Sequence, residues 1–362
     1  MSATVYFASV AFDRIDPDAT LPARFLRVLE RYPLTDMVKG RRVAVKMHLG
    51  GNLGYSTIPP LFVRLLIQKL KEAGGDVFVT DVPWATTEAV ARGYTAEVLG
   101  APILPATGRA DRYFYPVPVE YKSLREIQVA GEIRDSDVLI DLSHVKGHGA
   151  CGYGGACKNL AMGCVTAATR SQIHALQGGL TWQEDRCTHC ESCLEACRYG
   201  ANRFDEQGTY HIDYEACHYC QHCANACPEG AISIDAEAFA DFQEGMALST
   251  RAVLSSFAPG RVLFINFLLH MTYLCDCWGL TTPALLPDIG LVVSEDIVAV
   301  EQASLDLIRV EDLIWQGLPK GKRIGSEGHL FQRIHGKDPF VQVRALERYG
   351  LGTRQYELVE VQ

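Results

Sequence analysis

The sequence predicts an α/β protein, with a mostly parallel sheet and helices on both faces, into which a small cysteine-rich α+β domain is inserted. Runs rich in Val, Ile and Phe alternate with helical patterns along most of the chain, and eight cysteines recur at regular spacing between positions 187 and 227. Strand–helix alternation favours parallel pairing, because parallel neighbours need a crossover connection. With 362 residues, 48% of them hydrophobic, the chain can form one large core and a small satellite domain.

Short apolar runs bounded by turn residues predict the strands, and amphipathic stretches between them predict the helices. The expected strands are Thr4–Val10, Arg42–His48, Asp76–Val82, Asp137–Ser143, Arg261–Leu268 and Gly290–Ser294. The expected helices are Pro59–Ala73, Thr86–Leu99, Ala236–Ser255 and Asp296–Ile308. The cysteine-rich segment interrupts this alternation, which divides the chain into a host domain of residues 1–179 and 236–362 and an insertion of residues 180–235.

The insertion carries two copies of Cys-x2-Cys-x2-Cys-x3-Cys, 30 residues apart, each with the spacing of a bacterial ferredoxin half. Three thiolates of one such loop bind the same 4Fe–4S cluster, and the fourth binds the cluster of the other repeat. One cluster is therefore assigned to Cys187, Cys190, Cys193 and Cys227, and the other to Cys217, Cys220, Cys223 and Cys197. The insertion is predicted to be a two-cluster electron-transfer domain.

Zinc is the alternative for paired Cys-x2-Cys motifs, but structural zinc sites usually separate the two pairs by a longer loop. The first repeat departs from the usual pattern because Arg198 stands where the second repeat has Pro228. His189, His218 and His222 lie inside the loops, and we interpret them as residues that tune the sulfur environment rather than as ligands.

Cysteines in cluster motifs indicate a reducing compartment. The sequence shows no charged leader before an apolar run and no apolar stretch of about 18 residues, so we expect a cytoplasmic protein without membrane insertion. The formal net charge of −9 and the lack of a basic stripe argue against a nucleic-acid partner.

Polar side chains gather where the predicted strands end, which is where open α/β sheets bind ligands. His48 closes the second strand, Asp81 the third, and His144, Lys146 and His148 follow the fourth. His270 follows the fifth, and Lys46 shares the side of its strand with His48. A histidine at a strand end is often a capped or core-edge side chain, but the convergence of several predicts a binding cleft with proton carriers.

The richest of these segments runs from Ser143 to Cys164 and holds six glycines among 22 residues. Glycines allow a backbone to approach a ligand closely, and Lys158 and Asn159 are expected near the start of a helix whose amides favour an anion. A phosphate or carboxylate site fits this pattern, although a glycine-rich turn that packs against the insertion would also explain it. Neither a Walker loop nor a dinucleotide-binding glycine motif is present.

Five cysteines lie outside the repeats: Cys151, Cys157, Cys164, Cys275 and Cys277. If the loop after the fifth strand faces the glycine-rich segment, Cys164, Cys275 and Cys277 could form a third iron–sulfur or metal site, with Cys157 as a further candidate. A redox-active dithiol and plain buried core cysteines are the alternatives.

With these motifs in view, the chain resembles the domain-of-unknown-function family numbered 362, in its iron–sulfur form with an inserted two-cluster ferredoxin domain. The matching stretches are Lys46–Gly50, Ser143–His148, Gly154–Leu160, Met162–Cys164, both cysteine repeats, Cys275–Trp278, Pro287–Gly290 and Gly350–Gly352. The resemblance implies an iron–sulfur protein with an α/β host domain and no settled substrate.

The leading hypothesis is a reductase that takes electrons from a soluble donor such as ferredoxin and delivers them to an anionic small molecule in the cleft. Lys46, Lys146 and Lys158 would bind the anion, and His48, His144 or His148 would supply protons. A dedicated electron carrier that docks a partner enzyme, and a metal or cofactor maturation factor with structural clusters, are the alternatives.

Overall fold

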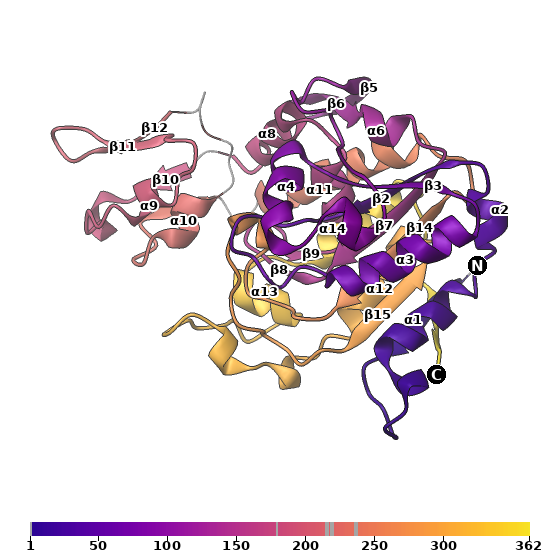
Figure 1. Cartoon of the computed structure of the whole chain (residues 1–362). Helices are drawn as coiled ribbons and strands as arrows, with labels where there is room; N and C mark the ends of the chain where they lie inside the picture. The colour runs from indigo at the N-terminus through magenta and orange to yellow at the C-terminus, as the bar shows by residue number, and fades with distance from the viewer. Residues whose placement is uncertain (1, 179, 214–216, 218–220, 235–237) are drawn as a thin grey trace.

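The computed structural model describes residues 2–178, 180–213, 217, 221–234 and 238–362. Its centre is an eight-stranded sheet in the order β16-β1-β15-β14-β7-β2-β3-β4 (Figure 1). In that order the strands span Tyr356–Glu360, Ala3–Ser9, Gly290–Ser294, Val262–Leu268, Val138–His144, Arg42–Met47, Asp76–Asp81 and Ile103–Pro105. All neighbours pair in parallel except β15, which is antiparallel to both β1 and β14. The predicted α/β class and mostly parallel sheet are confirmed.

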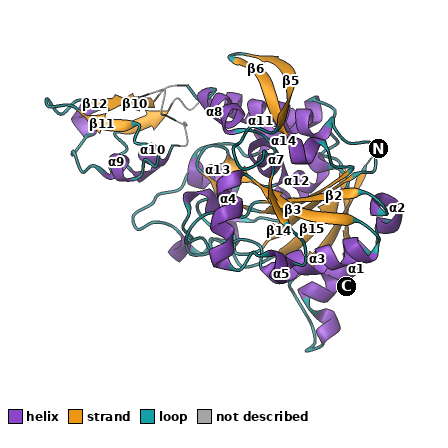
Figure 2. Cartoon of the chain, turned by 45° about the horizontal axis from the view of Figure 1, so that its top comes forward, coloured by secondary structure: helices purple, strands orange, loops and turns teal. Residues whose placement is uncertain are grey.

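Helices cover both faces of this sheet, as Figure 2 shows. On one face, Phe25 of α1 (Leu21–Leu29) and Leu66 of α3 (Pro60–Glu72) share a core with Val43 and Val45 of β2. On the other face, the core includes residues of α7 (Ala156–Gly163), α11 (Ala238–Leu254), α12 (Ile297–Asp306) and α14 (Phe340–Arg348). Successive residues of a strand point to opposite faces, so Ala44 and Lys46 of β2 lie on the α7 side.

The remaining host elements are short. The helices are α2 (Leu34–Val38), α4 (Pro83–Glu88), α5 (Ala96–Leu99), α6 (Gly131–Arg134), α8 (Ala167–Ala175) and α13 (Leu330–His335). Two hairpins pair β5 (Phe114–Tyr121) with β6 (Leu124–Ala130) and β8 (Lys146–His148) with β9 (Gly152–Gly154). Within the described ranges, every helix is too short or too polar to cross a bilayer.

One expected helix is broken. Thr86–Leu99 was expected to be continuous, but α4 runs into a 3-10 turn at Ala89–Arg92 and α5 begins separately at Ala96. Gly93 ends the turn with a φ of 88°, in the left-handed region that glycine favours, and the Thr95 side chain then accepts a hydrogen bond from the amide of Val98.

A small lobe projects from the host domain (Figures 1 and 2). Its described elements run from Leu180 to Ile234: β10 (Leu180–Trp182) pairs with β13 (Ile232–Ile234), and β11 (Asn202–Phe204) with β12 (Tyr210–Ile212), all antiparallel. Two short helices, α9 (Ser192–Glu195) and α10 (His222–Ala226), complete it. Its own apolar core is built around Cys193, Tyr210, Cys223 and Ile232.

Candidate functional site

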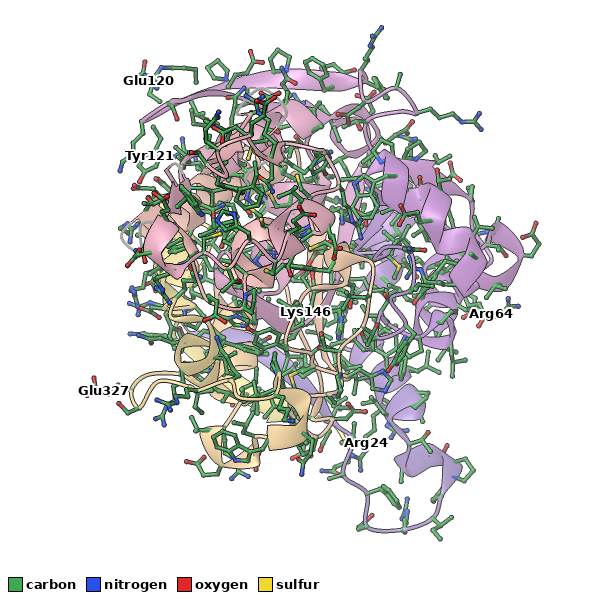
Figure 3. All side chains as sticks on the ribbon, turned by 90° about the vertical axis from the view of Figure 1, so that its left-hand side faces the viewer. Arg24, Arg64, Glu120, Tyr121, Lys146 and Glu327 are labelled. Atoms are coloured by element: carbon green, nitrogen blue, oxygen red, sulfur yellow. The ribbon has the colours of Figure 1, made fainter. Side chains whose placement is uncertain are left out.

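A cleft of about 340 Å³ lies at the carboxyl ends of β2, β3 and β7, where the sequence predicted it. It is lined by seven of the residues predicted to act there: Lys46, His48, His144, Lys146, His148, Lys158 and Asn159. Figure 3, viewed from the lobe side, places Lys146 in the middle of the molecule, and only 3% of this residue is exposed. The cleft is also lined by four residues that the sequence did not predict there: Trp84, Arg170, His174 and Trp278.

Lys46 forms the floor of the cleft and is fully buried. Its ammonium lies 3.1 Å from Asp81 and donates to the side-chain oxygen of Asn159, whose amide nitrogen donates to Asp141 at 2.7 Å. Burial alone would raise the pKa of Asp81, but Lys46 and His48 outweigh it and hold that pKa well below its usual range. The polar groups of Lys46 and Asn159 therefore bind partners within this network, and the network holds the side chains of the cleft in position.

Gly163 makes room for Lys46. A Cβ at this position would lie 2.1 Å from Lys46 Cε, which real side chains do not allow. Gly163 ends α7, so the glycine lets the helix pass directly over the buried lysine. This packing explains one of the six glycines in the segment.

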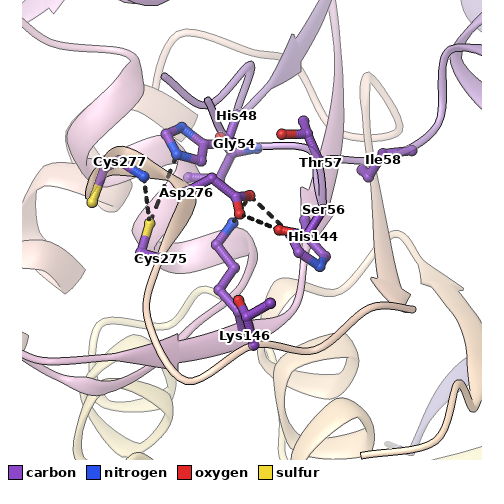
Figure 4. A network of polar contacts seen from close by, with 12 residues as sticks. His48, Gly54, Ser56, Thr57, Ile58, His144, Lys146, Cys275, Asp276 and Cys277 are labelled. Carbon is purple, nitrogen blue, oxygen red and sulfur yellow. Dashed lines mark hydrogen bonds and ion pairs between the residues drawn. The ribbon is translucent and has the colours of Figure 1, made fainter. Parts of the chain in front are cut away.

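His144 and Asp276 form a second buried pair, shown in Figure 4. His144 Nδ1 lies 3.0 Å from Asp276 Oδ2, and His144 Nε2 lies 2.8 Å from the carbonyl of Leu269. Ser56 donates to Asp276 at 2.8 Å, and the Lys146 ammonium lies 3.8 Å from it. Burial alone would raise the pKa of Asp276, but His144 and Lys146 hold it well below its usual range. Because both nitrogens of His144 already face acceptors, this ring holds the loop in place rather than facing a ligand.

The loop after β14 brings Cys275 and Cys277 to the cleft. Cys275 Sγ lies 3.4 Å from the Lys158 ammonium, 3.7 Å from His48 Nε2 and 3.5 Å from the amide of Cys277. Burial alone would raise the pKa of Cys275, but a hydrogen bond from the Cys277 thiol and the charges of Lys158, Lys146 and His48 keep it well below its usual range. These neighbours favour the thiolate form of Cys275.

His148 joins these two cysteines. One ligand atom each from His148, Cys275 and Cys277 lies within 4.8 Å of the others, so the three form a possible metal-binding group. Burial and the charge of Lys158 lower the pKa of His148 well below its usual value, which keeps the ring neutral.

The structure places Cys164 elsewhere. It follows α7, is fully buried, and has Lys46, Asp141 and Asp81 as its charged neighbours. Among the described residues it does not belong to the group formed by Cys275 and Cys277. Cys157 faces Thr250 at 3.6 Å.

The start of α7 also differs from expectation. The amide of Cys157, in its first turn, donates to the buried carboxyl group of Glu301 at 2.7 Å. Glu301 thus takes the place that a bound anion was expected to occupy. The positive charge at this end of the cleft comes from Lys158 instead.

In the lobe, four cysteines line one small cavity: Cys187, Cys190 and Cys193 of the first repeat and Cys227 of the second. Of the other predicted set, Cys223 is close enough to Cys197 for the two to interact electrostatically. Cys217 is described, whereas Cys220 lies outside the described residues, as does His218. The two loops match in backbone, since Glu191 and Gln221 both take left-handed conformations directly before α9 and α10.

The lobe contacts the thiol loop through residues next to its cysteines. Arg198, which replaces the usual proline, donates to the carbonyl of Trp278. The ring of His222, beside Cys223, lies 3.9 Å from the ring of Trp278. Arg198, Tyr199, His222 and Asn225 all line the cleft, so the lobe forms one of its walls.

Residues 43–306 match the model of a protein family described as a domain of unknown function, DUF362. The match covers well over half of the chain. The chain belongs to this family. The sequence resemblance is thereby confirmed at the level of the family, whose description names neither an iron–sulfur cluster nor a ferredoxin domain.

Two solved structures show a distant likeness. Lactate racemase apoprotein from Thermoanaerobacterium thermosaccharolyticum aligns with a TM-score of 0.35 and 10% identity, over 74% of this chain and 55% of its own. A protein from Thermotoga maritima aligns with a TM-score of 0.30 and 14% identity, over 66% of this chain and 61% of its own. The DUF362 chain thus spans less than two thirds of either protein. No curated protein shows a significant match.

Proposed function

We propose that this DUF362 protein is an iron–sulfur oxidoreductase, in which two 4Fe–4S clusters in the lobe supply electrons to an anionic ligand in the cleft. The observation that carries the proposal is the contact between the two cysteine-bearing regions. His222 precedes Cys223 in the second repeat and packs its ring on Trp278, which follows Cys277. A redox centre on the second repeat would therefore lie next to the cleft wall.

The cavity in the lobe supports the crossed ligand assignment. It gathers three cysteines of the first repeat with Cys227 of the second. This combination of three thiolates and a distant fourth is typical of two-cluster ferredoxins. Structural zinc pairs would not require the fourth cysteine to come from the other repeat.

The two proposed cluster sites differ in their relation to the cleft. Cys190, of the first set, is exposed. Arg198 and His222 adjoin Cys197 and Cys223 and line the cleft. A soluble ferredoxin-type donor would therefore dock at the first-repeat side, and electrons would leave from the second set toward the cleft.

The cleft residues divide into three roles. Lys146 and Lys158 supply positive charge for an anionic group. His48, whose side chain is 11% exposed, lines the cleft and is placed to deliver protons. Adding two electrons to a carbon–carbon or carbon–oxygen double bond consumes two protons, which such donors provide. Lys46, Asn159 and His144 hold the other groups in position.

The test is reoxidation of the reduced protein by small anions. Protein purified and reduced without oxygen is desalted and mixed with fumarate, a 2-oxo acid or sulfite, and the recovery of iron–sulfur absorbance is followed. We expect one class of acceptor to reoxidise the parent, and Lys158→Met to block this with its iron content unchanged. Lys69→Met is the matched control, because Lys69 lies in the last turn of α3 and is not among the residues that line the cleft.

Equal reoxidation of the Lys158→Met protein would show that electrons leave without the cleft. Together with fast exchange with a redox protein in both variants, that result would favour an electron carrier. A protein that binds no iron would contradict the proposal outright.

A further inference from the structure

We infer that His148, Cys275 and Cys277 form a mononuclear metal site for a borderline-soft divalent ion such as Zn²⁺, with one coordination position open to the cleft. The inference goes beyond the proposed function, because it concerns a second metal centre in the host domain. It stands on the arrangement of these three side chains whether or not the lobe binds iron.

The donor set identifies the class of ion. Two sulfur ligands and one imidazole suit zinc and related first-row ions, and they do not suit magnesium or calcium, which prefer oxygen ligands. With bonds of about 2.3 Å to sulfur and about 2.0 Å to nitrogen, tetrahedral ligand atoms lie roughly 3.5–3.8 Å apart. The three donor atoms are within 4.8 Å of one another, so small side-chain movements suffice.

The number of available thiolates distinguishes a site for one metal ion from a site for an iron–sulfur cluster. A 4Fe–4S cluster is normally held by four cysteines. Cys164, the other cysteine predicted for this site, lies near Lys46 and Asp81 and is not in the group. Among the described residues the group offers only two sulfur atoms, which favours one ion over a third cluster.

The charges around the site are balanced. Two thiolates neutralise a divalent ion, and Lys158 contacts Cys275 at 3.4 Å. Cys277 and His148 both line the cleft, so the fourth position would face a bound anion. Such an ion would act there as a Lewis acid, beside the ammonium group of Lys158.

One contact has to change. The amide of Ala150 donates to His148 Nδ1 at 3.1 Å, which in a neutral ring leaves the proton on Nε2. Metal binding through either ring nitrogen therefore requires the loss of this contact, because the lone pair of Nδ1 is then taken by the ion or by the proton. Ligand protons are displaced in any such site, since sulfur also binds as thiolate.

The experiment measures metals per chain in the full-length protein. Protein purified without oxygen is given one equivalent of Zn²⁺, passed through a desalting column and analysed for zinc and iron. We expect about one zinc per chain in the parent, with two sulfur neighbours at about 2.3 Å in its zinc-edge X-ray absorption. His148→Gln and Cys277→Ser should lose that zinc and keep the parent's iron content.

Cys151→Ser is the control, because Cys151 is also a free cysteine of the host domain but lies outside the group. A parent without bound zinc would overturn the inference, and so would zinc retained in both His148→Gln and Cys277→Ser. Loss of about four irons from Cys277→Ser would instead establish a third cluster. Absence of iron from the lobe would refute the proposed function alone, because the zinc difference between parent and variants would still be measured.

Discussion

The lobe and the cleft differ in how far apart in the sequence their candidate functional residues lie. In the lobe, eight cysteines sit within 41 residues, and their spacing alone predicts the grouping of Cys187, Cys190 and Cys193 with Cys227 around one cavity. In the cleft, the interacting side chains come from positions as far apart as Lys46, Asn159 and Asp276, and the sheet brings them together. A local motif can be read without a fold, whereas an assembled site depends on the packing of buried charges.

The largest expected effect is the loss of a whole cluster, and it should differ between substitutions that affect the two cluster sites of the lobe. Cys193→Ser should remove the cluster held with Cys227, and Cys197→Ser should remove the cluster held with Cys217 and Cys223, each with loss of about four irons. The measurement is iron content together with low-temperature EPR of the reduced proteins. If both substitutions removed the same signal, the crossed assignment would be wrong. Cys151→Ser should leave the iron content unchanged.

A substitution in the buried network of the cleft should lower the free energy of unfolding and leave the iron content unchanged. Asp276→Asn removes the buried carboxylate that both His144 and Lys146 contact. Breaking a buried ionic network by removing one member costs about 3–5 kcal/mol of the free energy of unfolding. Urea denaturation of the iron-loaded protein measures this cost. Glu72→Gln, which breaks the exposed pair with Lys69, should cost less than about 1 kcal/mol. Equal effects would mean that the cleft network is not what holds this loop.

The buried carboxyl group of Glu301 should make the free energy of unfolding depend on pH. Burial raises its pKa to about 7, so the folded chain keeps this proton at pH values where the unfolded chain has released it. The free energy of unfolding should therefore fall as the pH rises from about 4.5 to about 7, by up to about 3 kcal/mol. Glu301→Gln should flatten this part of the profile. Asp141, whose pKa burial also raises to about 7, leaves a residual slope of the same sign. An unchanged profile in Glu301→Gln would show that this carboxyl is not protonated in the folded protein near neutral pH.

The smallest expected effect concerns Gly163. Its replacement by alanine forces Lys46 to move, at a cost of about 1–3 kcal/mol for overpacking. Gly245→Ala is the comparison, because its Cβ would meet the side chain of Leu176 in a wholly apolar contact. We expect only Gly163→Ala to weaken anion-dependent reoxidation as well. If both substitutions changed stability and reoxidation alike, Gly163 would have no special relation to the cleft.

The sequence predicted the residues of the cleft better than their roles. Strand ends located Lys46, His48, His144 and Lys146 correctly, because parallel strands present their carboxyl ends at one edge. It could not show that His144 lies between Asp276 and the Leu269 carbonyl, since that depends on a loop more than 120 residues away.

Two further differences between the site expected from the sequence and the site in the structure have similar causes. Cys164 was grouped with Cys275 by residue type, but the length of α7 places it near Lys46. Glu301, which takes the amide at the start of α7, comes from a helix late in the chain and carries no local signal. Arg198 was visible as an irregularity in the first repeat, and the structure supplies its contact, the carbonyl of Trp278.

The most direct test of the central claim is the content of iron and acid-labile sulfide per chain in protein purified without oxygen. Two 4Fe–4S clusters in the lobe predict about eight irons and about eight sulfides, and Cys275→Ser should keep all of them. Zinc in the lobe without sulfide would contradict the account, as would about four irons in the parent.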